Sequence, residues 1–344
     1  MDIALLQTLS EAAGVPGREE RIRAIIERSL EGIVDNVETD AMGNLIAYKS
    51  SGQPDAKRVM LSAHMDEIGF YVRFIDERGF LRVQQAGGFD TRNLFARQVT
   101  VHASSGQDLI GVMNPATKPI HIATPEERKK IPEMSEFAID LGLPAETVKA
   151  QVRIGDMVTL RQTFCDLGEV VTGKALDDRV NCWILLQVLQ QLQAPSYDIY
   201  AVFSVQEEVG LRGAMTSAYH VQPDIGIALD TTLAVDIPGT PSEQRVTEMG
   251  KGTAIKVMDS STISTRWLVD AFIAIADEHS IPYQLEILPL GGTDAGAIQR
   301  SRQGVPTLTL STPSRYVHTV TEMVAKADLE AAISLLKHYL ELNA

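Results

Sequence analysis

The hydrophobic and polar positions along this chain follow two alternating periods over most of its length. Residues 17–31 place isoleucine and leucine at helical spacing among charged residues, which predicts an amphipathic helix. Residues 58–63 and 199–205 are short, largely apolar runs, as expected for strands buried in a sheet. Residues 178–192 form a longer run that is apolar on most sides, which predicts a buried helix.

The same alternation continues through the second half of the sequence. Further strands are predicted at residues 44–48, 225–229, 253–258, 284–288 and 307–310, and further helices at residues 264–278 and 328–342. Apolar strands that alternate with helices predict a sheet covered by helices on both faces. The expected fold class is therefore α/β.

A different pattern interrupts this alternation between about residues 72 and 164. Short β-rich segments separated by glycine-rich turns lie at residues 79–88, 97–106, 108–113 and 155–160. This pattern is typical of a small barrel or sandwich. We therefore predict one α/β domain formed by residues 1–71 and 168–344, into which a β-rich domain of residues 72–167 is inserted.

Composition and charge narrow the class of protein. The 344 residues include 31 basic and 45 acidic side chains, a net charge of −14 that repels phosphate backbones, so we expect no nucleic-acid partner. No run approaches the roughly 18 apolar residues of a membrane span, and the N-terminus lacks the basic and apolar segments of a signal peptide. We therefore expect a cytoplasmic protein with no membrane partner. Cys165 and Cys182 have apolar or aromatic neighbours, which predicts two buried thiols.

Polar side chains recur where predicted strands end. His64 ends the strand at 58–63, and a histidine there can present a ring nitrogen to a metal ion, while Asp66 could orient the imidazole. Asp177 and Asp178 precede the buried helix, where an aspartate can cap the helix or bridge two cations. A structural histidine and a simple helix cap remain the alternatives.

Two adjacent glutamates, Glu207 and Glu208, follow the strand at 199–205. Neighbouring carboxylates repel each other unless a cation or a proton relieves them. A metal site can use one as a ligand, while the other takes a proton from the attacking water and returns it to the leaving amine. The alternative is a solvated charge pair.

Asp230 and His318 complete the set of polar residues near strand ends. Taken singly, they could be a turn former and a surface histidine. Open α/β sheets bind ligands outside the carboxyl ends of their strands, so together the five motifs predict one site. Mixed imidazole and carboxylate ligands suit zinc, cobalt or manganese.

Six motifs, AHMDEIGF, GKALDDR, VQEEVGLRGA, ALDTT, GGTDAGA and RYVH, resemble in sequence and order those of the tetrahedral dodecameric metallo-aminopeptidases, which include glutamyl and deblocking aminopeptidases. The resemblance covers nearly the whole chain. It implies a zinc-peptidase-like αβα sandwich interrupted by a barrel-like dimerisation domain, with two divalent metal ions per subunit. Zinc or cobalt is expected, with manganese as a further candidate. The resemblance also implies short peptides as substrates and dimers that assemble into a tetrahedral dodecamer.

The resemblance assigns the metal ligands, with one aspartate shared by both ions. The ligand positions are His64, Asp177, Glu208, Asp230 and His318. Asp177 would bridge the ions, one held with Glu208 and His318, the other with His64 and Asp230.

The resemblance also assigns two catalytic residues and a substrate-binding loop. Glu207 falls where the family keeps its general acid/base, and Asp66 where it keeps a carboxylate that supports the histidine. Gly292, Thr293 and Asp294 match a loop near the substrate pocket and are predicted to bind substrate.

The predicted activity is hydrolysis of the N-terminal residue from short peptides by water that the metal ions activate. One alternative is a related dinuclear amidohydrolase, a deacylase or a carboxypeptidase, for which Arg315 could bind a C-terminal carboxylate. The other is a metal-binding relative without activity. The preferred N-terminal residue stays open, because a preference for acidic residues needs a cation such as Lys251, Arg315 or Arg212 in the pocket.

Overall fold

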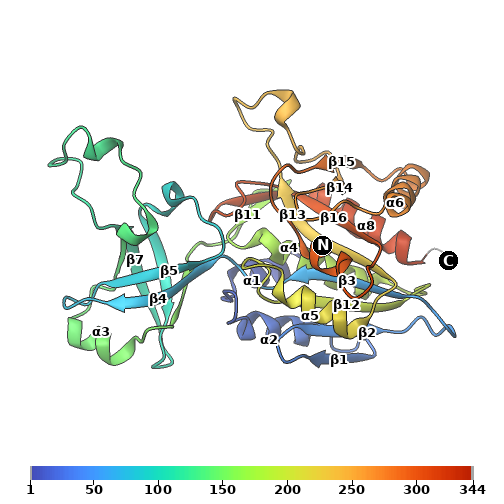
Figure 1. Ribbon diagram of the computed structural model, residues 1–344, viewed down its shortest axis with the longest axis horizontal. Helices are drawn as coiled ribbons and strands as arrows, with labels where there is room; N and C mark the ends of the chain where they lie inside the picture. Colours follow the sequence, from blue (N-terminus) through green and yellow to red (C-terminus); the bar gives the residue numbers. More distant parts are fainter. Residues whose placement is uncertain (1, 342–344) are drawn as a thin grey trace.

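The computed structural model describes residues 2–341 and contains two separate β-sheets (Figure 1). The larger sheet has eleven strands within these residues. Its main path runs, in spatial order, through β1 (Asn36–Thr39), β2 (Leu45–Lys49), β12 (Asp198–Ser204), β3 (Arg58–His64), β13 (Ile225–Leu233), β16 (Thr307–Arg315), β17 (Glu322–Ala325), β11 (Val170–Gly173) and β10 (Cys165–Asp166). Beside β16 the sheet is extended by β14 (Thr253–Met258) and then β15 (Tyr283–Ile287).

Four central strands, β12, β3, β13 and β16, run parallel, so their carboxyl ends meet at one edge of the sheet. Helices cover both faces. One face packs against α1 (Ile3–Glu11), α2 (Glu20–Ser29), α4 (Leu176–Gln191), α6 (Arg266–His279) and α8 (Lys326–Glu341), and the other against α5 (Arg212–Val221) and α7 (Asp294–Gln299). The predicted αβα sandwich is confirmed.

The second sheet closes into a barrel at one end of the molecule (Figure 1). Around the barrel its strands are β4 (Gly69–Ile75), β5 (Leu81–Ala86), β8 (Phe137–Asp140), β7 (Asp108–Pro115), β6 (Arg97–His102) and β9 (Met157–Leu160), with α3 (Ala145–Gln151) packed against them. Phe70, Val99 and Phe137 belong to a core separate from that of the larger sheet. The predicted barrel is confirmed, while its limits as a domain of residues 72–167 stay a prediction.

Two central strands are longer than the hydrophobic pattern predicts. β13 continues from residue 229 to Leu233, and β16 continues from residue 310 to Arg315. The extra residues of the two strands pair with each other, Asp230 opposite Ser311 and Leu233 opposite Ser314. Asp230 therefore lies within a strand, and the prediction that it lies at the strand end is wrong.

The remaining helices are short. Between residues 2 and 341, four 3₁₀ helices lie at Thr91–Leu94, Glu127–Lys129, Met134–Glu136 and Ser242–Gln244. Leu342, the predicted end of the last helix, lies outside the described residues. No helix within the described residues is long and apolar enough to cross a membrane.

The two cysteines lie in different environments. Cys182 is buried in α4, whereas Cys165 is exposed on β10, so the prediction of two buried thiols is wrong for Cys165. Strand β10 has only two residues and lies at the edge of the sheet, which leaves both side chains in contact with solvent.

A buried ion pair joins the segment where the chain enters the barrel to the segment that leads into α4. Glu67 precedes β4, Lys174 follows β11, and Lys174 Nζ lies 2.6 Å from Glu67 Oε2. Both side chains are less than a tenth exposed. The pair therefore ties the entry to the barrel to the segment before α4.

Arg179 ties the N-terminal segment to the centre of the sandwich. Its guanidinium is fully buried and lies 3.8 Å from Glu67. It donates hydrogen bonds to four backbone carbonyls, those of Leu9, Ala12, Gly14 and Met65. Losing these donors would leave buried carbonyl groups without partners, which costs free energy.

We predict that Arg179→Met lowers the free energy of unfolding by roughly 3 kcal/mol or more, because several buried carbonyls lose their donor. The matched control is Arg266→Met, since the Arg266 side chain is 88% exposed in a surface pair with Asp270 and its loss should change stability by about 0.5 kcal/mol or less. Urea denaturation followed by circular dichroism measures both. Equal midpoints for the two variants would contradict the structural role of Arg179.

Candidate metal centre and active site

His64 is the last residue of β3 and is held in one orientation. Its Nδ1 lies 3.0 Å from the backbone carbonyl oxygen of Asp66, and its Nε2 lies 3.2 Å from Asp177 Oδ1. A carbonyl oxygen only accepts hydrogen bonds, so Nδ1 carries the proton in the neutral ring and Nε2 is left with a lone pair. This orientation suits a histidine that binds a metal ion through Nε2.

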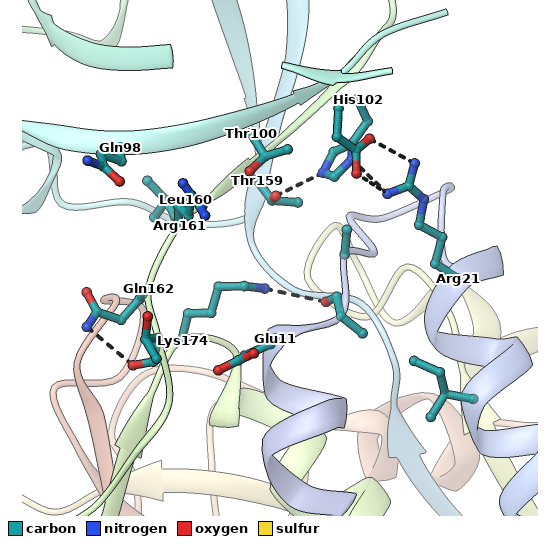
Figure 2. Close-up of a pocket in the computed structure, with 15 residues that line it drawn as sticks. Glu11, Arg21, Gln98, Thr100, His102, Thr159, Leu160, Arg161, Gln162 and Lys174 are labelled. Carbon is teal, nitrogen blue, oxygen red and sulfur yellow. Dashed lines mark hydrogen bonds and ion pairs between the residues drawn. The ribbon is translucent and has the colours of Figure 1, made fainter. Parts of the chain in front are cut away.

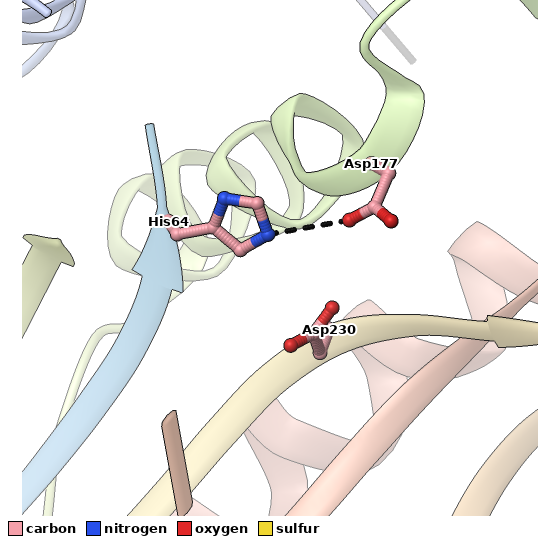
Figure 3. Close-up of side chains that lie close together, drawn as sticks. All are labelled: His64, Asp177 and Asp230. Carbon is pink, nitrogen blue, oxygen red and sulfur yellow. Dashed lines mark hydrogen bonds and ion pairs between the residues drawn. The ribbon is translucent and has the colours of Figure 1, made fainter. Parts of the chain in front are cut away.

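Two groups of potential metal ligands lie side by side and share one aspartate. The first, from the ends of β3 and α4 and from β13, consists of His64, Asp177 and Asp230 (Figure 3). The second consists of Asp177, Glu208 and His318. In each group the ligand atoms lie within 4.8 Å of one another. We call these groups donor set A and donor set B.

Donor set B brings together residues from three separate motifs. His318 Nε2 lies 3.2 Å from Glu208 Oε1 and 3.5 Å from Asp177 Oδ2. Glu208 follows β12, and His318 lies in the loop between β16 and β17. The structure therefore places the other four predicted ligands around Asp177.

The carboxylates of this cluster are buried close together, and both burial and their mutual repulsion disfavour the charged forms. Burial raises the pKa of Glu207 and Asp230 well above the ordinary carboxylate range, and neighbouring carboxylates add to the effect. Burial also acts to raise the pKa of Asp177, but hydrogen bonds with His318 and His64 outweigh it and lower that pKa. Divalent cations bound in sets A and B would offset this buried negative charge. The donor atoms, imidazole nitrogen and carboxylate oxygen, fit zinc, cobalt or manganese.

The two adjacent glutamates occupy different positions. Glu208 belongs to donor set B, whereas Glu207 belongs to neither set. Glu207 Oε2 lies 3.8 Å from His64 Nε2, and both side chains line one cavity. Glu207 can therefore reach a molecule at the centre without serving as a ligand in either donor set.

Asp66 holds both the histidine and the glutamate pair. Its carboxylate accepts hydrogen bonds from the backbone N–H groups of Glu207 and Glu208, each at 3.1 Å. Its backbone carbonyl, rather than its carboxylate, makes the closest contact with His64 Nδ1, since the carboxylate lies 3.6 Å away. The side chain is fully buried. Asp66 thus acts mainly on the loop that carries the glutamates.

Two further carboxylates that the sequence analysis did not assign support the ligands. Glu322 accepts hydrogen bonds from the backbone N–H groups of His318, at 2.8 Å, and Asp177, at 3.0 Å. Burial and the charge of Asp177 raise the pKa of Glu322 to about 8. Asp178 accepts a hydrogen bond from the backbone N–H of His64 at 3.1 Å and belongs to neither donor set. Both residues position ligands through the backbone.

The donor sets open into a cavity of about 540 Å³. Gly292 and Thr293 line it, as predicted for substrate-binding residues, but Asp294 does not. The Asp294 carboxylate is buried and accepts hydrogen bonds from the hydroxyl groups of Ser62 and Ser204. It anchors the start of α7 to β3 and β12.

The candidate cations for an acidic substrate lie elsewhere. Arg315 is held by two hydrogen bonds of 2.6 Å to Asp236, and neither it nor Lys251 and Arg212 lines the cavity. Lys256, which the sequence analysis did not single out, does line it. The pKa of Lys256 is raised, because the carboxylates of Glu286 and nearby aspartates outweigh the opposing effect of its burial.

A second cavity, of about 640 Å³, lies between the N-terminal helices and the barrel (Figure 2). Three of its ionic groups pair with one another, Arg21 with Asp108 at 2.7 Å and His102 with Asp108 at 2.8 Å. No donor set for a metal ion occurs there within the described residues. The chemistry of the site therefore belongs to the cavity at the strand ends.

Comparison with known proteins gives matches along nearly the whole chain. The profile of the M42 glutamyl aminopeptidase family matches residues 43–335. Lysyl aminopeptidase of Pyrococcus furiosus is 33% identical over 350 residues, which span 99% of this chain and 97% of the relative. The structure of aminopeptidase APDkam598 from the archaeon Desulfurococcus kamchatkensis is 36% identical with a TM-score of 0.93, covering 98% of this chain and 94% of that one. Pyrococcus horikoshii TET1 peptidase, which can assemble into a tetrahedron or a large octahedral shell, is 32% identical with a TM-score of 0.87, covering 98% of each chain.

The sandwich, the barrel and the cluster of potential metal ligands belong to a fold that this chain shares with solved aminopeptidases, which places it in the class of peptidases. The family match and the identities above show to which family of peptidases the chain belongs. The chain belongs to the M42 glutamyl aminopeptidase family, so the predicted resemblance is confirmed and the protein is a hydrolase that acts on peptide bonds.

We predict that Glu322→Gln weakens divalent-metal binding by roughly 10- to 100-fold, because a glutamine has one acceptor oxygen where the carboxylate serves two backbone N–H groups. Isothermal titration of the metal-free protein with Zn²⁺ measures the change. Glu330→Gln, on the exposed side of α8, is the matched control and should bind like the unchanged protein. Unaltered affinity in Glu322→Gln would show that Glu322 does not support the ligands.

Proposed function

We propose that this chain is a dinuclear-metal aminopeptidase that removes the N-terminal residue from short peptides. The observation that carries the proposal is the pair of donor sets sharing Asp177, with Glu207 beside them in one cavity. Set A and set B would each hold one divalent ion, zinc, cobalt or manganese. When bound, these ions would acidify a water molecule and polarise the scissile carbonyl.

Glu207 is the group that moves the proton. Its carboxylate lies beside both donor sets but belongs to neither, so its oxygens stay free to accept a proton from the attacking water. Burial raises its pKa, which helps the carboxyl group to hold that proton until the leaving amine takes it. Asp66 fixes the position of Glu207 through the backbone N–H.

The acidic lining favours substrates with a free α-amine. The carboxylates of Glu208 and Asp230 face the cavity, where their oxygens can accept hydrogen bonds from a free α-amine. An acetylated N-terminus has no free amine to donate these bonds, which argues against a deacylase. Because Arg315 is held by Asp236 outside the cavity, the feature that would favour a carboxypeptidase is missing from the site.

Self-association through the barrel accompanies this proposal. Large apolar side chains are exposed on its strands and loops, among them Phe74 (55%), Phe95 (44%), Ile110 (54%) and Val112 (45%). Exposed apolar groups of this kind mark protein contacts. They support dimers that assemble into a tetrahedral dodecamer, an assembly of the kind described for the Pyrococcus horikoshii relative. A cytoplasmic location belongs to the same proposal.

Hydrolysis of aminoacyl anilides by chelator-treated protein tests the activity. We expect little cleavage without metal, recovery on adding Zn²⁺, Co²⁺ or Mn²⁺, and no cleavage of N-acetylated substrates, because the reaction needs both the ions and a free amine. Cleavage of acetylated substrates alone would favour a deacylase. Bound metal without any cleavage would point to an inactive relative.

Two variants separate the roles of the adjacent glutamates. Glu207→Gln should lower kcat by roughly 100- to 10,000-fold while the metal content stays unchanged, because the proton carrier is lost and the ligands are not. Glu208→Gln should lower both activity and metal content, since it removes a ligand of set B. Elemental analysis after dialysis, together with anilide hydrolysis, measures both. Near-normal turnover in Glu207→Gln would refute its role.

A further inference from the structure

The part of the cavity beyond the donor sets has a composition that bears on substrate choice. If the α-amine and the scissile bond lie at the metal ions, as the proposed function requires, the first side chain of the substrate must enter this part. Its walls include Leu211, Leu233, Leu288, Leu290 and Val317. Leu290 is 80% exposed and Leu233 is 41% exposed, so both offer apolar surface that a substrate could cover.

Lys256 is the one lysine or arginine that lines this cavity within the described residues, and it is already paired. Its Nζ lies 3.2 Å from Glu286 Oε1 and 3.4 Å from Asp259 Oδ2. The side chains of all three residues are 1% exposed or less. One ammonium group therefore faces two carboxylates.

One of the two carboxylate oxygens of Glu286 has no hydrogen-bond partner among the described residues. Its Oε1 accepts a hydrogen bond from the Thr232 hydroxyl at 2.6 Å, while its Oε2 is buried and has no hydrogen-bond partner among the described residues. Thr232 itself lines the cavity. The carboxylate of Glu286 thus lies directly behind the wall that the substrate would touch.

This arrangement disfavours both kinds of charged side chain. A substrate carboxylate next to Lys256 would become the third carboxylate around one ammonium group, and like charges in a buried site repel strongly. A substrate ammonium group would meet the ammonium of Lys256 before it reached the carboxylates behind it. A neutral apolar side chain encounters neither penalty and covers the leucine walls.

We infer that this aminopeptidase selects a neutral aliphatic N-terminal residue, with leucine as the model substrate, and that the pairing of Lys256 with Glu286 is the specificity-determining feature. The inference rests on the proposed function and adds to it the class of N-terminal residue that the enzyme removes. It also separates this chain from glutamyl and lysyl specificity, the two that the family description and one relative carry in their names.

The values of kcat/KM for leucyl, glutamyl and lysyl anilides on the Zn²⁺- or Co²⁺-loaded protein test the preference. We expect the leucyl substrate to exceed each charged one by roughly 10-fold or more, a ratio in the range that pocket contacts can provide. A glutamyl or lysyl value equal to or above the leucyl value would overturn the inference and leave the aminopeptidase proposal intact.

Binding distinguishes this outcome from failure of the proposed function. Isothermal titration of the metal-loaded protein with leucine hydroxamate and glutamate hydroxamate reports pocket preference without turnover. If no anilide is cleaved, the proposed function fails, and tighter binding of leucine hydroxamate would still support the pocket assignment. Equal or tighter binding of glutamate hydroxamate would overturn it.

Glu286→Gln tests the specificity-determining pair directly. Glutamine keeps an acceptor for Thr232 but removes one negative charge, so that Lys256 keeps Asp259 as its one carboxylate partner and a substrate carboxylate would be the second, not the third, around the ammonium group. We expect the glutamyl-to-leucyl ratio of kcat/KM to rise by roughly 10-fold. Glu278→Gln, on the exposed end of α6, removes the same charge outside the cavity and should leave the ratio unchanged. An unchanged ratio in Glu286→Gln would refute the role of the pair.

Discussion

Crowding of carboxylates away from water is the constraint on which the rest of the site depends. Asp177, Glu207, Glu208 and Asp230 lie within one cluster, and their negative charges repel one another in a poorly solvated environment. The imidazoles of His64 and His318 lie among these carboxylates. Further carboxylates around the cluster accept hydrogen bonds from backbone N–H groups and so hold the cluster in place. The acidic centre therefore needs a rigid scaffold before it can accept cations.

Parallel strands supply that scaffold. Because β3, β12 and β13 end at the same edge, residues far apart in sequence arrive beside one another without long loops. Asp66, Asp178 and Glu322 then fix the arrangement by accepting hydrogen bonds from the backbones of ligand-bearing segments. The positions of the ligand side chains are therefore set by the backbone, whose conformation varies less than that of an isolated side chain.

Much of this organisation could be predicted from the sequence, for physical reasons. Apolar runs fix strands and buried helices, and the motifs at their ends point to one edge of the sheet. The hydrophobic pattern did not predict strand residues that are buried but polar, as in the part of β13 that begins at Asp230. It also could not reveal Glu322 or the Lys256–Glu286 pair. Glu322 bonds to Asp177 across 145 residues, and no local spacing encodes such a contact.

The buried pair of Glu67 and Lys174 has an evolutionary consequence. Glu67 lies where the chain enters the barrel, shortly after His64, and Lys174 lies between β11 and α4, shortly before Asp177. With the entry to the barrel tied to the segment that leads into α4, the loops of the barrel can be lengthened, shortened or exchanged among descendants. New subunit contacts, and hence new quaternary architectures, can arise there while the spacing of the hydrolytic centre is inherited unchanged.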